Sequence, residues 1–114
     1  MSFGLLRKDE SIHLSCQGWF QAMRLAKMHG WKPAGPEGNY ETNDGQTVCE
    51  EEAVSMGEAL KNALPDIPDE DVLSIKGPVF PGDQVNPYEW FSGPRKQRLS
   101  LLIEYCRGGS FAIH

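Results

Sequence analysis

The sequence predicts a mainly α fold, or else an α+β fold, in which three helices form the core and a long proline-rich loop wraps around it. Three observations lead to this prediction. Apolar residues recur at helical spacing in three segments, glycine and proline separate these segments, and residues 65–91 contain five of the eight prolines. Because the 114 residues contain no repeat or linker, we expect a single globular domain over residues 1–114.

The first helix is expected to begin after Ser15, whose hydroxyl group can cap the helix N-terminus. The apolar residues that share one face of this helix are Trp19, Ala22, Met23 and Ala26. Gly30 is expected to end the helix in a left-handed conformation, and "KPAGPEGN" then forms a loop. The segment "SIHLS" before the helix is expected to be extended.

The second helix is expected to follow a capping box made by Thr47 and Glu50, in which each side chain accepts a hydrogen bond from the other residue's amide. Its apolar face would be formed by Ala53, Met56, Leu60 and Leu64. Helical spacing places Cys49 on the same face, and Pro65 should stop the helix.

The third helix follows "FSGP", with Ser92 as its expected cap and Pro94 in its first turn. Its apolar residues repeat at the spacing of one helical face and are Leu99, Leu102, Ile103 and Cys106. Leu101 and Tyr105 point to a second side, which predicts a central helix with neighbours on two faces. The most important core residues should be Trp19, Met23, Met56, Leu60, Leu99, Leu102, Ile103 and Cys106.

The chain is expected to end in short extended structure. Two glycines stop the third helix, and "SFAIH" then places Phe111 and Ile113 on one side of a strand. We expect this strand to pair with another around residues 40–42.

Charge is distributed unevenly along the chain, whose net charge is −5. Residues 1–36 carry five basic and two acidic side chains, residues 37–91 carry two and thirteen, and residues 92–114 carry four and one. The acidic middle would repel nucleic acid and attract a basic protein. The alternative is that the basic ends fold back and neutralise the acidic middle within the domain.

The composition indicates a cytoplasmic protein without a membrane segment. No apolar run approaches the ~18 residues of a membrane span, and the N-terminus lacks the apolar region of a signal peptide. The three cysteines are far apart and odd in number, which argues against a framework of disulfides.

Metal sites are not expected. The segment "YETNDGQTVCEE" resembles a calcium loop in Asp44, Gly45 and Glu51, but Tyr40 and Thr42 occupy two positions that need oxygen ligands. For zinc, only His13 and Cys16 have the short spacing of paired ligands. We therefore predict no metal and no cofactor.

The sequence contains no enzyme signature, and we predict no catalytic residue. It has no phosphate-binding loop or nucleophile elbow, and the adjacent carboxylates in "CEEEA" and "PDEDV" are expected to face solvent. Cys49 and Cys106 are expected to be buried and unreactive, whereas Cys16, near a helix N-terminus, is the cysteine to test for a reactive thiol.

Three segments resemble an uncharacterised family of short bacterial proteins: "AKMHGWKPAG" (26–35), "NYETNDGQTVCEEEA" (39–53) and "LIEYCRGGSFAIH" (102–114). Together they cover about a third of the chain. The shared motifs are a helix stop, a turn and a helix start, so the resemblance implies a common fold and no catalytic residue. It also suggests a link to loci for toxin neutralisation or phage defence.

We therefore expect a small acidic protein-binding module, such as an immunity or inhibitor protein that neutralises a basic partner such as a toxin or effector. The residues expected to bind this partner are Glu51, Glu58, Asp66, Asp69, Glu70, Asp71, Tyr88 and Trp90. One alternative is a small enzyme or ligand-binding protein with its site under the 65–91 loop. Another is a homodimer that associates through Leu101 and Tyr105.

Overall fold

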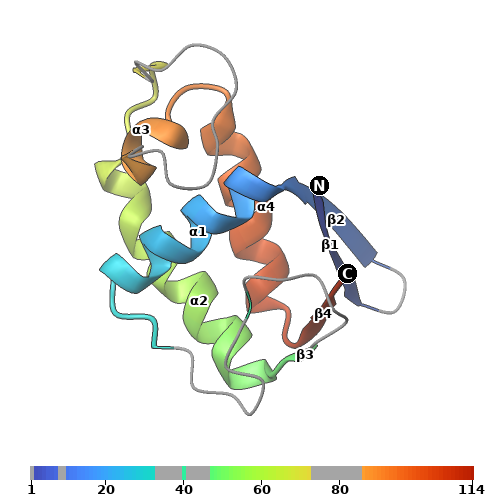
Figure 1. Cartoon of the computed structure of the whole chain (residues 1–114). Helices are drawn as coiled ribbons and strands as arrows, with labels where there is room; N and C mark the ends of the chain where they lie inside the picture. Colours follow the sequence, from blue (N-terminus) through green and yellow to red (C-terminus); the bar gives the residue numbers. More distant parts are fainter. Residues whose placement is uncertain (1, 8–9, 33–39, 41–46, 73–85) are drawn as a thin grey trace.

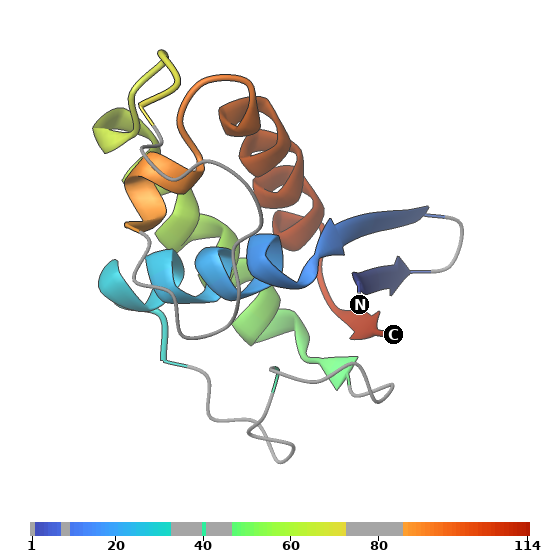
Figure 2. The same ribbon diagram turned by 45° about the horizontal axis from the view of Figure 1, so that its top comes forward.

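The protein is an α+β structure in which helices cover one face of an antiparallel sheet (Figures 1 and 2). The computed structural model describes residues 2–7, 10–32, 40, 47–72 and 86–114. The strands are β1 (Ser2–Arg7), β2 (Glu10–Ser15), β3 (Thr47–Val48) and β4 (Phe111–Ile113). The helices are α1 (Cys16–Met28), α2 (Glu50–Ala63), the 3₁₀ helix η1 (Leu64–Asp66), α3 (Pro87–Trp90) and α4 (Arg95–Arg107).

The four strands are arranged in the order β2-β1-β4-β3, and every neighbouring pair is antiparallel. Strand β1 pairs with β2 along its whole length, from Ser2 opposite Ser15 to Arg7 opposite Glu10. The last strand, β4, lies between β1 and β3, so the two ends of the chain meet in the centre of the sheet (Figure 1). The predicted pairing of β4 around residues 40–42 is wrong, because β1 and β3 occupy both of its edges.

The two faces of the sheet follow the alternation of side chains along each strand. The face toward the helices carries the buried residues Phe3, Leu5, Val48, Phe111 and Ile113. Along β2, Ile12 and Leu14 lie on this face and are partly buried at the margin of the core. No helix among the described residues covers the opposite face, where Leu6 is exposed.

Helix α1 begins and ends as predicted from the sequence. The Ser15 hydroxyl accepts a hydrogen bond of 2.9 Å from the Gly18 amide, which fixes the start of the helix. Gly30 follows the helix with φ of 97°, a conformation that glycine adopts without a steric cost. The predicted apolar face of α1 is fully within the core.

The predicted capping box before α2 is wrong. Thr47 belongs to β3, where it pairs with Ala112, and Cys49 occupies the cap position without a side-chain hydrogen bond to the helix backbone. Cys49 is therefore exposed and does not lie on the apolar face. Three glutamates occupy the first helical turn, where the helix dipole stabilises negative charge.

The chain after α2 differs from the predicted irregular loop in its described parts. Pro65 lies within η1, and Pro87 begins the short helix α3. Ser92 does not cap α4, because Pro94 is the cap residue. Instead, the buried Ser92 hydroxyl donates to the Glu89 carbonyl at 2.6 Å and accepts from the Val72 amide at 3.0 Å. The rest of the predicted loop, residues 73–85, lies outside the described residues.

The core combines the three long helices with the sheet, so the fold is the α+β alternative and the strands are more than a minor addition to a helical core. All of the predicted core residues are buried, as the helical spacing indicated. The sheet adds aromatic packing that was not predicted: the Trp19 ring lies 6.1 Å from the Phe3 ring and 6.4 Å from the Phe111 ring. The strands contribute five of the buried apolar residues of this core: Phe3, Leu5, Val48, Phe111 and Ile113.

Tyr40 connects α1 to α2. It is described in the structure, whereas residues 33–39 and 41–46 on either side of it are not. The Trp19 indole N–H donates to the Tyr40 carbonyl at 2.6 Å, and the Tyr40 hydroxyl donates to the Glu52 carboxylate at 3.0 Å. The Tyr40 ring also stacks on Trp31, with ring centroids 6.1 Å apart. These contacts give Glu52 a structural role in the first turn of α2.

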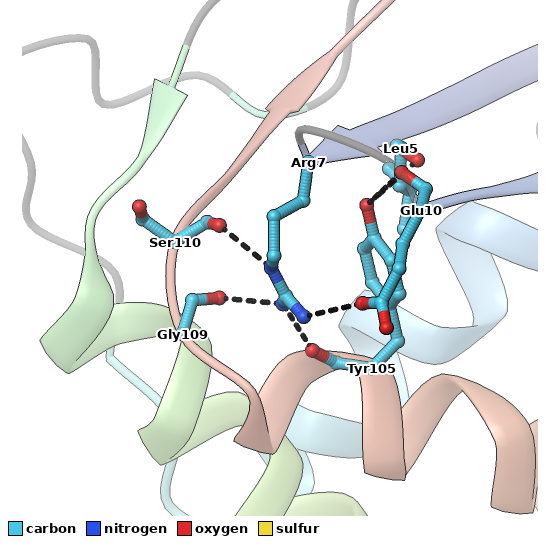
Figure 3. A network of polar contacts seen from close by, with 6 residues as sticks. All are labelled: Leu5, Arg7, Glu10, Tyr105, Gly109 and Ser110. Carbon is cyan, nitrogen blue, oxygen red and sulfur yellow. Dashed lines mark hydrogen bonds and ion pairs between the residues drawn. The ribbon is translucent and has the colours of Figure 1, made fainter.

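Arg7 joins the N-terminal hairpin to the end of α4 (Figure 3). Its guanidinium group donates to the carbonyl groups of Tyr105, Gly109 at 2.9 Å and Ser110 at 3.1 Å. It also forms an ion pair with Glu10 at 3.2 Å. Since the last carbonyl groups of a helix lack partners within the helix, Arg7 acts as a C-terminal cap supplied by a distant strand.

None of the described helices is both long enough and apolar enough to cross a membrane.

Candidate partner-binding surface

Six of the predicted partner-binding residues form one exposed surface along α2 and the segment that follows it. We call this the acidic surface; its residues are Glu51, Glu58, Asp66, Asp69, Glu70 and Asp71. Along α2, Glu51 and Glu58 share an outward face with Ser55 and Asn62, as the helical spacing predicted. Residues 50–72 contain eight acidic side chains and one basic side chain, Lys61.

Basic residues at the start of α4 bind the segment that carries Asp69 and Asp71. The Lys96 ammonium group forms a 2.8 Å ion pair with Asp69 and donates to the Ile67 carbonyl at 2.8 Å. Arg95 forms a 2.7 Å ion pair with Asp71. The hydrogen bond and charge of Lys96 hold the pKa of the Asp69 carboxyl below its ordinary value. These two carboxylates therefore help to hold the segment in place.

Glu58 also has an internal partner. Its carboxylate lies 3.0 Å from the Arg107 guanidinium at the end of α4. Basic residues from the C-terminal part of the chain thus neutralise three members of the acidic surface. This is the internal neutralisation that the sequence left open as an alternative, and it applies to Glu58, Asp69 and Asp71.

The other three residues of the acidic surface remain available to a partner. Glu51, Asp66 and Glu70 are exposed, and they form no ion pair with any residue that the structure describes. They lie at the start of α2, just after its end, and in the segment bound to α4. The excess negative charge of this surface therefore resides mainly at its two ends.

The predicted aromatic anchors lie on α3, next to the segment that carries Asp71. Tyr88 and Trp90 are both partly buried and pack against the core. The Tyr88 hydroxyl lies 2.7 Å from the His29 Nε2 atom at the end of α1. Only the exposed parts of these side chains could contact a partner, because much of each ring fills space in the domain.

The described residues provide little support for an active site. No group of three metal-binding side chains comes together among them, and residues 41–46 of the calcium-like segment lie outside the described part. Cys106 is buried, and burial raises the pKa of its thiol to about 12, so it is a poor nucleophile. The Cys16 side chain is not described.

Two arrangements were missed because they join residues far apart in the sequence. The Arg7 network spans nearly the whole chain, and the His29–Tyr88 contact joins α1 to α3. A shallow hollow of about 520 Å³ also lies between β2 and α4, lined by Glu10, Ser11, Ile12, Leu101, Glu104 and Tyr105. The only sequence pattern that pointed to this hollow was the second apolar side predicted for α4.

The fold and the acidic surface define a small α+β protein with an exposed, partly neutralised carboxylate surface. Comparison with protein-family models, curated proteins and solved structures gave no match. The resemblance to a family of short bacterial proteins therefore stays a prediction.

Proposed function

We propose that this protein is a binding module that recognises a basic protein through its acidic surface. The observation that supports this proposal best is the exposure of Glu51, Asp66 and Glu70 on an ordered framework. Since α2 and the ion pairs from α4 fix the backbone, the carboxylates are positioned before a partner arrives. Such preorganisation reduces the entropy lost on binding.

The internal ion pairs divide the acidic surface into two kinds of residue. Asp69 and Asp71 attach the segment to α4, so replacing them would disturb the surface as well as its charge. Glu51 and Glu70 are exposed, and replacing them should change charge with little change in stability. A positively charged partner would be attracted mainly by Glu51 and Glu70, because no cation among the described residues cancels the electrostatic field of their carboxylates.

Recognition of a basic partner fits a role for this protein as an immunity or inhibitor protein that neutralises a basic toxin or effector. Charged complementary surfaces accelerate association, which is what a protein that must intercept its partner requires. We assign no catalytic residue, no metal and no cofactor in this proposal.

The proposal is tested by affinity capture from the native cell with three forms of the protein. The wild type should enrich a basic protein, and the double variant Glu51→Gln, Glu70→Gln should enrich it less. A control with Leu6→Lys and Ser110→Lys raises the net charge equally on the opposite face of the sheet. If the control loses the partner as strongly as the double variant, net charge alone governs capture and the acidic surface is not the site.

The alternative of a site under the 65–91 loop has one supporting contact, the hydrogen bond between His29 and Tyr88. A histidine beside a phenol can exchange protons with a ligand. The measurement that separates the two functions is the effect of Tyr88→Phe. A ligand site would lose affinity for its small molecule, whereas capture of a basic protein should change little.

A further inference from the structure

We infer that the free edge of β2, together with the hollow between β2 and α4, binds an extended segment of another protein that carries basic and apolar side chains. This inference does not depend on the acidic surface, because the two surfaces share no residue. The proposed mode is strand addition, in which the segment becomes a further strand of the sheet.

The backbone of β2 offers hydrogen-bonding groups on the edge that faces away from β1, where no other described strand pairs with it. Gly4 and His114 exchange two backbone hydrogen bonds of 3.3 and 2.7 Å, so the polar groups of Gly4 point toward β4. Backbone groups alternate in direction along an antiparallel strand, and Phe3 and Leu5 therefore point theirs toward β2. The same alternation along β2 directs the amide and carbonyl groups of Ser11 and His13 away from β1.

This edge lacks several of the features by which proteins protect a terminal strand. Among the described strands, β2 is at one end of the sheet, and all of its residues are paired with β1 without a bulge (Figure 1). Its sequence, "ESIHLS", contains neither lysine nor proline. A strand that is paired along its whole length and contains neither lysine nor proline is a suitable template for a further strand.

The adjoining hollow indicates which side chains the added strand would carry. Leu101 is 61% exposed and lies beside Ile12, so an apolar side chain on the helix-facing side of the new strand would cover both. The side chains of Glu10 and Glu104 line the same hollow. Each forms an ion pair at one side, Glu10 with Arg7 at 3.2 Å and Glu104 with Arg107 at 3.7 Å, yet 67% and 75% of the two side chains stay exposed. Lysine or arginine next to the apolar residue would complement these carboxylates.

The same charges argue against a second copy of this chain as the occupant. Strand β2 contains no lysine or arginine, so a second β2 would offer these carboxylates no cation, whereas a basic strand would supply one. We therefore assign the edge to a basic strand from a different protein.

The test uses a short blocked peptide designed as an isolated strand. Threonine occupies one face, and lysine, valine and lysine occupy the other. We expect it to bind with a Kd of about 100 μM or tighter, and to slow amide hydrogen exchange at Ser11 and His13 by about tenfold or more. The same peptide with glutamate in place of lysine should bind at least about tenfold more weakly. Alternate amides of the peptide point to opposite edges of the strand. Methylation of the set that points toward β2 should abolish binding, because these amides form the hydrogen bonds to β2.

Two variants separate the edge from the hollow. His13→Pro removes an outward amide and should prevent strand addition, whereas His13→Thr should bind the peptide as the wild type does. Glu104→Lys leaves β2 intact and should reverse the preference toward the glutamate peptide.

The inference is overturned if exchange at Ser11 and His13 does not change at saturating peptide, or if Glu104→Lys leaves the peptide preference unaltered. Sedimentation that shows a dimer, lost in His13→Pro, would assign the edge to a second copy instead. Each of these results is independent of the capture experiment on the acidic surface.

Discussion

The guanidinium carbon of Arg7 lies 4.3 Å from the centre of the Tyr105 ring, so the second face of α4 is occupied by a cation from the first strand. The Tyr105 hydroxyl extends the contact by donating to the Leu5 carbonyl at 2.9 Å (Figure 3). Together, the two side chains attach the N-terminal hairpin to the end of the C-terminal helix.

Replacement of Arg7 should therefore destabilise the whole domain. Arg7→Ala removes the side-chain donor to the carbonyl groups of Tyr105, Gly109 and Ser110, and we expect the free energy of unfolding to fall by about 2 to 3 kcal/mol. Arg98→Ala, an exposed change on the same helix as Tyr105, should cost less than about 0.5 kcal/mol. Urea denaturation of the three proteins measures both values. Equal losses in the two variants would show that the Arg7 network contributes nothing specific.

Cys106 should make the protein sensitive to alkaline pH. In the unfolded chain its thiol has the ordinary cysteine pKa of 9.0, and burial raises this pKa to about 12 in the folded state. As pH rises above 9, the unfolded state loses this proton while the folded state keeps it, so stability decreases with pH up to the folded pKa. The decrease can reach about 1.4 kcal/mol per pH unit.

The matched protein for this prediction is Cys106→Ala, which lacks the thiol. It should be less stable at neutral pH because of the cavity, but its stability should fall less steeply above pH 9. Tyr105, whose pKa is raised mainly by burial, remains in both proteins; because the charge of Cys106 also raises this pKa, Cys106→Ala removes that smaller contribution as well. Parallel stability curves in this pH range would exclude Cys106 as the cause.

Gly93 should control how the acidic segment attaches to α4. It has φ of 64°, and an added Cβ atom would lie 2.9 Å from the Asp71 backbone nitrogen. Gly93→Ala should displace Asp71 and its neighbour Val72, whose amide should then exchange its hydrogen faster. Gly30→Ala is the matched change, because Gly30 also has a positive φ but no atom within 4 Å of the added carbon. Fast exchange at Val72 in both variants would indicate general destabilisation instead.

The helical half of the fold could be predicted because its signal is local. The cap at Ser15 and the apolar spacing in α1 and α4 involve residues within a few turns of one another, and the structure contains them as predicted. The core residues of these helices follow directly from that spacing.

Much of the sheet could not be predicted because β4 pairs with β1 and β3, which are distant from it in the sequence. β1 carries Phe3 and Leu5 toward the core, but Arg7 occupies the next position on that face and breaks the apolar alternation. At β3, pairing with Ala112 recruits Thr47 into the sheet, which overrides the local preference for a helix cap.

The composition of the acidic surface could be predicted, and its internal neutralisation was left open as an alternative, but the carboxylates that are neutralised could not be identified. Residue spacing identified the exposed face of α2. The partners of Asp69 and Asp71 lie on α4, 27 and 24 residues away in the sequence, and only the fold brings them together. Which carboxylates remain available is therefore a property of the structure.

The most direct test of the proposed function is the association rate with the captured basic protein, measured as a function of salt concentration. The wild-type rate should fall by about tenfold or more from low to high salt, since screening weakens the attraction between exposed charges. The variant Glu51→Gln, Glu70→Gln should associate more slowly at low salt, with a shallower salt dependence and a similar dissociation rate. The Leu6→Lys, Ser110→Lys control should retain most of the wild-type salt dependence. Identical salt dependence in the wild type and the glutamine variant would contradict the account.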